Sequence, residues 1–204
     1  MHLDVLFEPK IDLPRLAQVL DELGHLGRVD TVRRWGRARQ AALFEAAQGF
    51  RPVSLDDFVP PGTDGLAEVI HHGKNTLPAF THFQKRFCKP SDAAAADRLW
   101  GYNHQDLAWA TGPGYFVTHP SETAGEVDID YREIPKEKPA PWPAIARNEE
   151  RLGRFVYAGM VDVMRGISSH VSIGRAKRAR SGAGGRHDWM DAWFVLVRED
   201  RANS

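Results

Sequence analysis

Apolar residues in the first fifty positions recur at helical spacing. One stripe begins after Asp12, a good N-cap residue, and ends at Gly24. Its members are Leu13, Leu16, Leu20 and Leu23. A broader stripe follows Asp30 or Thr31 and ends at Gly49. The pattern predicts a helical hairpin over residues 1–50.

From residue 66 the apolar period becomes strand-like, and the segments become short, aromatic and β-branched. Turn residues such as the Gly-Pro-Gly at 112–114 separate them. The predicted strands are 67–72, 80–89, 99–105, 107–111, 115–119 and 127–134. Such short links join antiparallel neighbours, because parallel pairing needs a crossover of a dozen or more residues. We therefore expect an antiparallel meander over residues 66–134.

The last third of the chain shows a helical pattern followed by two strand-like segments. Asn148 is a good N-cap for an apolar stripe that ends at Ile167, which predicts a helix over residues 148–168. Strand-like segments at 170–177 and 192–198, joined by a Gly/Ser/Arg-rich loop, predict a closing hairpin over residues 170–198.

These elements predict one α+β domain over residues 1–204. Runs of strands flanked by helices are typical of helices packed on a sheet or plugging a barrel. We expect a curved, mainly antiparallel sheet or a partly closed β-barrel, with an N-terminal helical hairpin and one long helix in the C-terminal half. Such curved sheets often hold a small molecule inside the curve.

Composition narrows the class of protein. With 42% hydrophobic and 26% charged residues, the chain matches an ordinary globular protein and not a disordered one. Cys88 is the only cysteine, which excludes an internal disulfide and a multi-cysteine metal site. No apolar run is long enough to cross a bilayer, and residues 1–13 do not read as a secretory signal. We expect a cytoplasmic protein without a membrane partner.

The predicted sheet is rich in rings and polar groups, as the wall of a ligand pocket would be. Packing alone also favours aromatic residues in strands, so the same rings are equally typical of a solid core. The predicted ligand-binding residues are His72, Tyr102, Asn103, Trp109, Tyr115 and Arg175.

Catalytic chemistry is predicted for His82, His104 and Asp130, as an imidazole and carboxylate acid/base set. The alternation along residues 127–132 also supports a plainer interpretation. If Val127, Ile129 and Tyr131 face the core, Asp130 faces solvent. Adjacent histidines such as His71 and His72 cannot share one face of a strand, and no metal-binding motif is present. We therefore expect no metal site and no cofactor.

Two basic clusters are candidates for contact with a partner. One comprises Arg33, Arg34, Arg37 and Arg39, and the other Arg175, Lys177, Arg178, Arg180 and Arg186. Lys plus Arg and Asp plus Glu both number 27, and this zero net charge does not favour nucleic-acid binding.

Three functions therefore stay open at this point. The leading hypothesis is a domain that binds a largely apolar small molecule with one polar or anionic group in an aromatic cavity. The first alternative is an acid/base enzyme of isomerase, hydratase or hydrolase type using His and Asp in that cavity. The second is a protein or nucleic-acid interaction module using the basic clusters.

Overall fold

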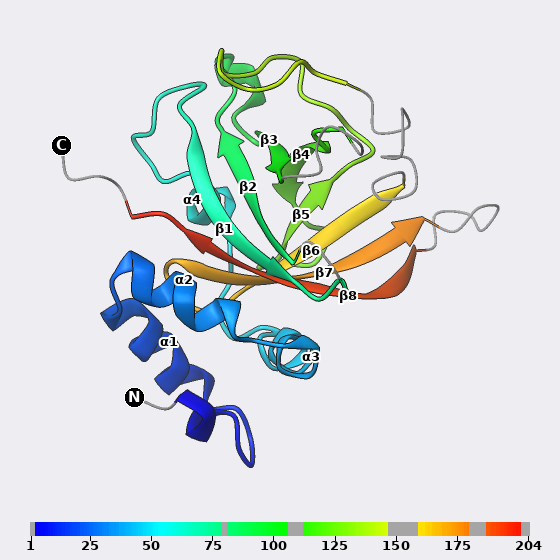
Figure 1. Ribbon diagram of the computed structural model, residues 1–204. Helices are drawn as coiled ribbons and strands as arrows, with labels where there is room; N and C mark the ends of the chain where they lie inside the picture. The colour runs from blue at the N-terminus through cyan, green and yellow to red at the C-terminus, as the bar shows by residue number, and fades with distance from the viewer. Residues whose placement is uncertain (1–2, 79–80, 106–111, 147–158, 180–186, 201–204) are drawn as a thin grey trace.

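The computed structural model describes residues 3–78, 81–105, 112–146, 159–179 and 187–200. Within them, eight antiparallel strands form a closed barrel in which each strand pairs with the next and the last pairs with the first (Figure 1). The strands are β1 (Val69–Asn75), β2 (His82–Cys88), β3 (Leu99–His104), β4 (Tyr115–Pro120), β5 (Val127–Asp130), β6 (Met160–Gly166), β7 (Val171–Ala179) and β8 (His187–Arg198).

Closure of the barrel depends on the pairing of β1 with β8. Its register runs from His71 opposite Arg198 to Asn75 opposite Phe194. The predicted antiparallel, barrel-like α+β class is confirmed, but the sheet is closed and not partly closed. Closure gives every strand two hydrogen-bonded neighbours, so that no edge is left to pair with other chains.

Helices and 3-10 turns occupy mainly the N-terminal part of the described chain. They are η1 (Leu3–Leu6), α1 (Leu13–Glu22), α2 (His25–Arg33), α3 (Arg37–Ala46), α4 (Leu55–Phe58) and η2 (Ala93–Ala95). The predicted first helix is confirmed as α1, and the Asp12 side chain caps it by accepting from the Arg15 N–H at 3.1 Å. None of the described helices combines the length and apolar character needed to cross a membrane.

The predicted second helix is two helices. The chain breaks between α2 and α3, where Gly36 adopts an extended conformation before the first residue of α3. Glycine costs more conformational entropy in a helix than other residues do, which favours an interruption at this point. The N-terminal region is therefore a three-helix layer and not a hairpin.

The predicted long helix over residues 148–168 is wrong in its second half, where the chain forms strand β6. Residues from both faces of β6 are buried, including Val161, Val163 and Met164. A strand buried on both faces loses its polar alternation and cannot be told from a buried helix by periodicity. Residues 147–158, like the predicted strand at 107–111, lie outside the described residues.

Helices α2 and α3 cover the outer face of the barrel at strands β1, β7 and β8, and α1 contributes to the same buried apolar cluster (Figure 1). Their apolar residues pack on outward-facing strand residues. The fully buried members of this layer include Leu16, Leu20, Trp35, Leu43 and Phe44 from the helices and Ile173, Val195 and Val197 from the strands. Strand β8 is therefore apolar on both faces, with Val195 and Val197 against the helices and Phe194 and Leu196 toward the interior.

One end of the barrel interior is filled by its own side chains. The short helix α4, held by a capping box between Ser54 and Asp57, places Phe58 against His71 and Phe87. The ring of Phe87 continues the packing to Phe116, with centroids 5.3 Å apart. These rings and their aliphatic neighbours fill one end of the interior but not the other.

Candidate functional site in the barrel interior

A cavity of about 300 Å³ lies beyond the filled end of the barrel. Apolar and aromatic side chains form most of its wall, and a few polar groups converge on it. The lining residues are Asn75, Leu77, Phe83, Lys85, Asn103, Gln105, Tyr131, Met160, Asp162, Ala176, Arg178, Met190, Ala192, Trp193 and Phe194. Its size lies at the lower limit of small-molecule sites.

Four buried polar side chains meet where the cavity borders the filled core. Lys85 comes from β2, Asn103 from β3, Tyr131 directly follows β5, and Asp162 comes from β6. Each is at most 4% exposed. Side chains alternate along strands, so Lys85, Tyr131 and Asp162 face the interior together with the apolar residues two positions away.

Lys85 is the centre of this polar cluster. Its Nζ lies 3.2 Å from Asp162 Oδ2, donates to Asn103 Oδ1 at 3.0 Å, and also donates to the Tyr131 hydroxyl. Asn103 Nδ2 donates to the same hydroxyl at 3.0 Å. The four side chains thus form one hydrogen-bonded network.

Aromatic rings surround the Lys85 ammonium. Its Nζ lies 4.8 Å from the ring centroid of Tyr131, 4.9 Å from that of Phe116 and 5.0 Å from that of Phe194. At these distances the negative faces of the rings stabilise a cation. The cluster is therefore polar at its centre and aromatic around it.

Burial shifts the titration of both charged groups. It lowers the pKa of Lys85, against the attraction of Asp162, and raises the pKa of Asp162, against the attraction of Lys85. Both shifts favour the neutral forms, so proton transfer within the pair costs less than it would in water. Perturbed titratable groups at a cavity are typical of functional sites.

Of the predicted site residues that the structure describes, only Asn103 lines the cavity. His82 and His104 are exposed at the ends of β2 and β3, in the outward-facing phase of the strands. Asp130 also faces outward, next to the inward Ile129 and Tyr131 of the same alternation. The structure does not bring these three together with the cavity, and their catalytic roles stay predictions.

Asp130 is buried on the outer face by its own partners. Arg132 donates to its carboxylate at 2.5 Å, and His119 Nε2 lies 3.9 Å from it. Burial alone would raise the pKa of Asp130, but the contacts from His119 and Arg132 outweigh it and hold that pKa well below its usual value. Asp130 is thus a paired carboxylate near neutral pH.

Tyr102, Tyr115, His72 and Arg175, which were predicted to bind a ligand, lie on the outside of the barrel. Tyr102 and Tyr115 pack beneath Trp142, and the Tyr115 hydroxyl donates to the Pro143 carbonyl at 2.5 Å. His72 contacts Glu199, and Arg175 lies over the rings of Trp189 and Trp193. Trp109 lies outside the described residues. Ligand-binding roles for these residues also stay predictions.

The same outer cluster contains the only cysteine. Cys88 is fully buried beside Trp100 and Tyr102. Burial, with the nearby Glu137 and Glu68, raises the pKa of its thiol to about 12. A thiol of this kind stays protonated at neutral pH and is a poor nucleophile.

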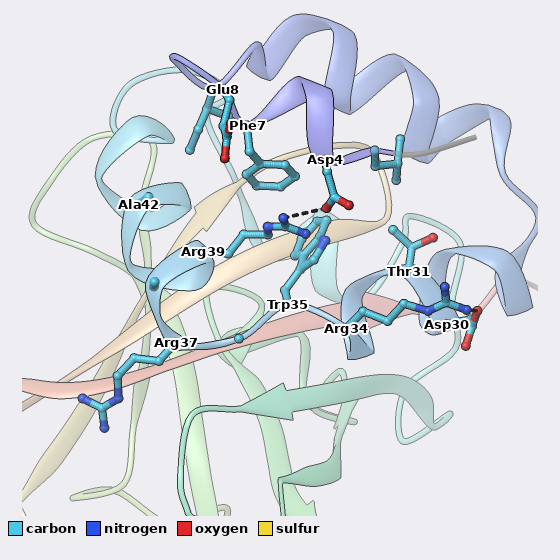
Figure 2. Close-up of a pocket in the computed structure, with 14 residues that line it drawn as sticks. Asp4, Phe7, Glu8, Asp30, Thr31, Arg34, Trp35, Arg37, Arg39 and Ala42 are labelled. Carbon is cyan, nitrogen blue, oxygen red and sulfur yellow. Dashed lines mark hydrogen bonds and ion pairs between the residues drawn. The ribbon is translucent and has the colours of Figure 1, made fainter.

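A second hollow lies between η1 and the start of α3 and is lined by three of the four arginines of the first basic cluster, Arg34, Arg37 and Arg39 (Figure 2). Arg39 pairs with Asp4 at 2.7 Å and lies over the ring of Phe7, while Arg34 pairs with Asp30 at 2.5 Å. These cations already have carboxylate partners. The hollow has a larger volume, about 850 Å³, but its ion pairs are exposed, whereas the polar groups of the interior cavity are buried.

Comparison with protein-family models and with curated proteins finds no match to this chain. Function is thus argued from geometry. A closed eight-stranded barrel with buried aromatic clusters is compatible with a ligand-binding barrel, because barrels of this strand number hold side chains or one small ligand.

Proposed function

We propose that the barrel binds one small, largely apolar molecule whose single polar group contacts Lys85, Asn103 and Tyr131. The observation that carries this proposal is the four-residue polar network at the base of an apolar cavity. Apolar walls provide affinity through burial, while convergent polar groups fix the orientation of the ligand.

The charge balance of the cluster indicates which polar group is preferred. Lys85 and Asp162 compensate one another, so a carbonyl or hydroxyl adds no net charge to the buried site. A carboxylate would bring an unbalanced negative charge unless Asp162 takes up a proton. Since burial raises the pKa of Asp162, a carboxylate ligand should bind with proton uptake and more tightly at acidic pH.

Matched eight-carbon probes test this proposal. Titration of octanol, octan-2-one and octanoate, followed by calorimetry and tryptophan fluorescence, should show saturable binding. Replacement of the ion pair by Lys85→Met with Asp162→Leu should weaken octan-2-one by about tenfold, the effect of losing about 1.4 kcal/mol of polar contact. Octanoate affinity should fall as pH rises, and octanol affinity should not.

Two controls make the result decisive. Ala176→Phe places a ring in the cavity and should abolish binding of all three probes. Arg34→Ala, in an exposed ion pair on the helical layer, should leave binding unchanged. Absence of saturable binding to wild type, or equal binding by Ala176→Phe, would reject the cavity as the site.

A second candidate function is an enzyme that acts through Lys85. The specific observation is a lysine of lowered pKa enclosed with Tyr131 and Asp162. An unprotonated amine attacks an aldehyde or ketone carbon to form a carbinolamine, which loses water to give an imine. Asp162 and Tyr131 are placed to exchange the protons that these two steps require.

Borohydride trapping separates the enzyme from the binder. Octanal at substoichiometric concentration, followed by sodium borohydride, should reduce the imine to a secondary amine that adds one octyl group to Lys85. Peptide mass spectrometry should find this group on Lys85 before surface lysines such as Lys10, and should find none there in Lys85→Met. Labelling of surface lysines alone would support binding without covalent chemistry.

A further inference from the structure

Two histidines and a carboxylate meet on the outside of the barrel, far from the interior cavity. His25 is the first residue of α2, His72 lies in β1, and Glu199 directly follows β8. One donor atom from each lies within 4.8 Å of the donor atoms of the other two. His72 Nε2 lies 2.6 Å from Glu199 Oε1, and the two imidazole centroids are 5.1 Å apart.

Closure of the barrel produces this meeting. The Glu199 N–H donates to the Ile70 carbonyl at 2.9 Å, which holds the end of β8 alongside β1. His72 faces outward here because its neighbour His71 faces the interior, where it contacts Phe58. Helix α2 packs across both strands and adds His25 from above.

The donor set suits a borderline metal ion. Imidazole nitrogens with one carboxylate oxygen are typical ligands of Zn²⁺, at about 2.0–2.2 Å from the metal. In a tetrahedral site such ligands lie about 3.3 Å apart, so the widest possible separation here closes by side-chain rotation of about 1.5 Å.

The state of His25 favours a metal over a hydrogen bond. Its Nδ1 is buried and has no hydrogen-bond partner among the described residues. An imidazole nitrogen in this position is available to coordinate a metal ion, and His25 is the first residue of α2, beside the His72–Glu199 contact.

The nearby basic residues Arg28 and His170 pair with Asp200 and not with Glu199. The adjacent Asp200 is occupied by Arg28 at 2.6 Å and lies 3.3 Å from His170 Nδ1. The Arg28 charge is therefore compensated by Asp200. Glu199, in contrast, pairs with His72 and with no Lys or Arg among the described residues.

We propose that His25, His72 and Glu199 bind one Zn²⁺ ion, which fastens α2 to the seam where β1 and β8 close the barrel. Three protein donors leave the fourth position of a tetrahedral site to water. The ion would thus join three segments that are remote in sequence and stabilise the helical layer on the barrel.

Calorimetric titration of zinc chloride into chelator-treated protein tests the site. Wild type should bind one ion per chain. The variants His25→Ala, His72→Ala and Glu199→Gln should each bind zinc at least about tenfold more weakly, as expected for loss of one ligand. The control His82→Ala removes an exposed histidine of β2 and should bind zinc like wild type.

Thermal unfolding gives an independent readout. Zinc should raise the melting temperature of wild type and His82→Ala, and should leave that of His25→Ala unchanged. His25 is only half-buried at a helix start, so its alanine variant should fold even where Glu199→Gln does not. Equal zinc affinity in wild type and His25→Ala, or no bound zinc in wild type, would overturn the proposal.

Discussion

The two ends of the barrel interior solve the same packing problem in opposite ways. At one end, Phe58, Phe87 and Phe116 fill the space with rings in mutual contact. At the other, Lys85 and Asp162 are buried beside a cavity of about 300 Å³. The first arrangement stabilises the fold by burial of apolar surface, and the second buries charges that carry a desolvation cost.

This difference supports the cavity end as the place of the proposed function. A buried ion pair is often less stabilising than apolar side chains of the same volume, and a cavity forgoes packing contacts. The cavity end therefore carries features that folding alone does not require. The filled end shows that apolar packing is available to this architecture.

The largest expected effect comes from breaking the buried pair. Lys85→Met leaves Asp162 buried without its cation and should lower the free energy of unfolding by about 3–5 kcal/mol at pH 7. Adding Asp162→Leu removes both charges and should restore the lost stability or exceed wild type by about 1–4 kcal/mol. Urea denaturation of the single and double variants measures both changes.

The double variant decides the comparison. A double variant as unstable as Lys85→Met would mean that the polar cluster is needed for folding, and the proposed division between the two ends would fail. The exposed pair Arg34–Asp30 provides the control, because its removal should cost only about 0.3–0.5 kcal/mol.

A smaller effect is expected from adding a methyl group at each end. A Cβ at Gly101 would lie 2.1 Å from the Phe116 ring and 2.8 Å from the Arg86 carbonyl oxygen, so Gly101→Ala should cost about 1–3 kcal/mol. Ala176 borders the cavity, so Ala176→Val should keep or raise stability, by up to about 2 kcal/mol. Thermal and urea unfolding compare the two; similar losses would show that the cavity end is also tightly packed.

The effect that is smallest near neutral pH is a pH dependence of stability at the filled end. Burial lowers the pKa of His71 to about 3, because charging it between Phe58 and Phe87 is unfavourable. The unfolded chain takes up this proton near pH 6.5 and the folded chain only near pH 3. Acid therefore favours unfolding, and stability should fall by about 1.4 kcal/mol per pH unit between these values.

The matched variants isolate the contribution of His71. His71→Gln keeps an N–H that can donate to the Phe58 carbonyl and should flatten the dependence between pH 6 and 4. His104→Gln changes an exposed histidine and should leave the dependence as in wild type. Equal slopes in all three proteins would contradict the assignment to His71.

Local signals in the sequence predicted much of the fold. The Asp12 cap and leucine spacing predicted α1, and the alternation of Ile129 with Asp130 correctly indicated which side faces the core. These features depend on interactions within one turn or one strand. Where strands are buried on both faces, as in β6, the alternation disappears and the prediction became a helix.

Alternation along the strands can also predict which cavity residues face the interior, but it does not predict which of them meet. Phe83 and Phe87 place Lys85 on the inward phase of β2, which the sequence alone can suggest. The predicted catalytic residues His82 and His104 lie on the outward-facing side of β2 and β3. The available signal was Lys85, a charged residue on the same face of the strand as Phe83 and Phe87.

By itself, the sequence determined the antiparallel order of most strands, the start of the helical layer and the absence of any multi-cysteine site. Only the tertiary structure decided that the sheet closes, that Lys85 meets Asp162 and that His25, His72 and Glu199 meet at the β1–β8 seam. Local periodicity sets which way a side chain faces, whereas closure and strand register set which distant side chains it meets. These contacts depend on the packing of the whole barrel.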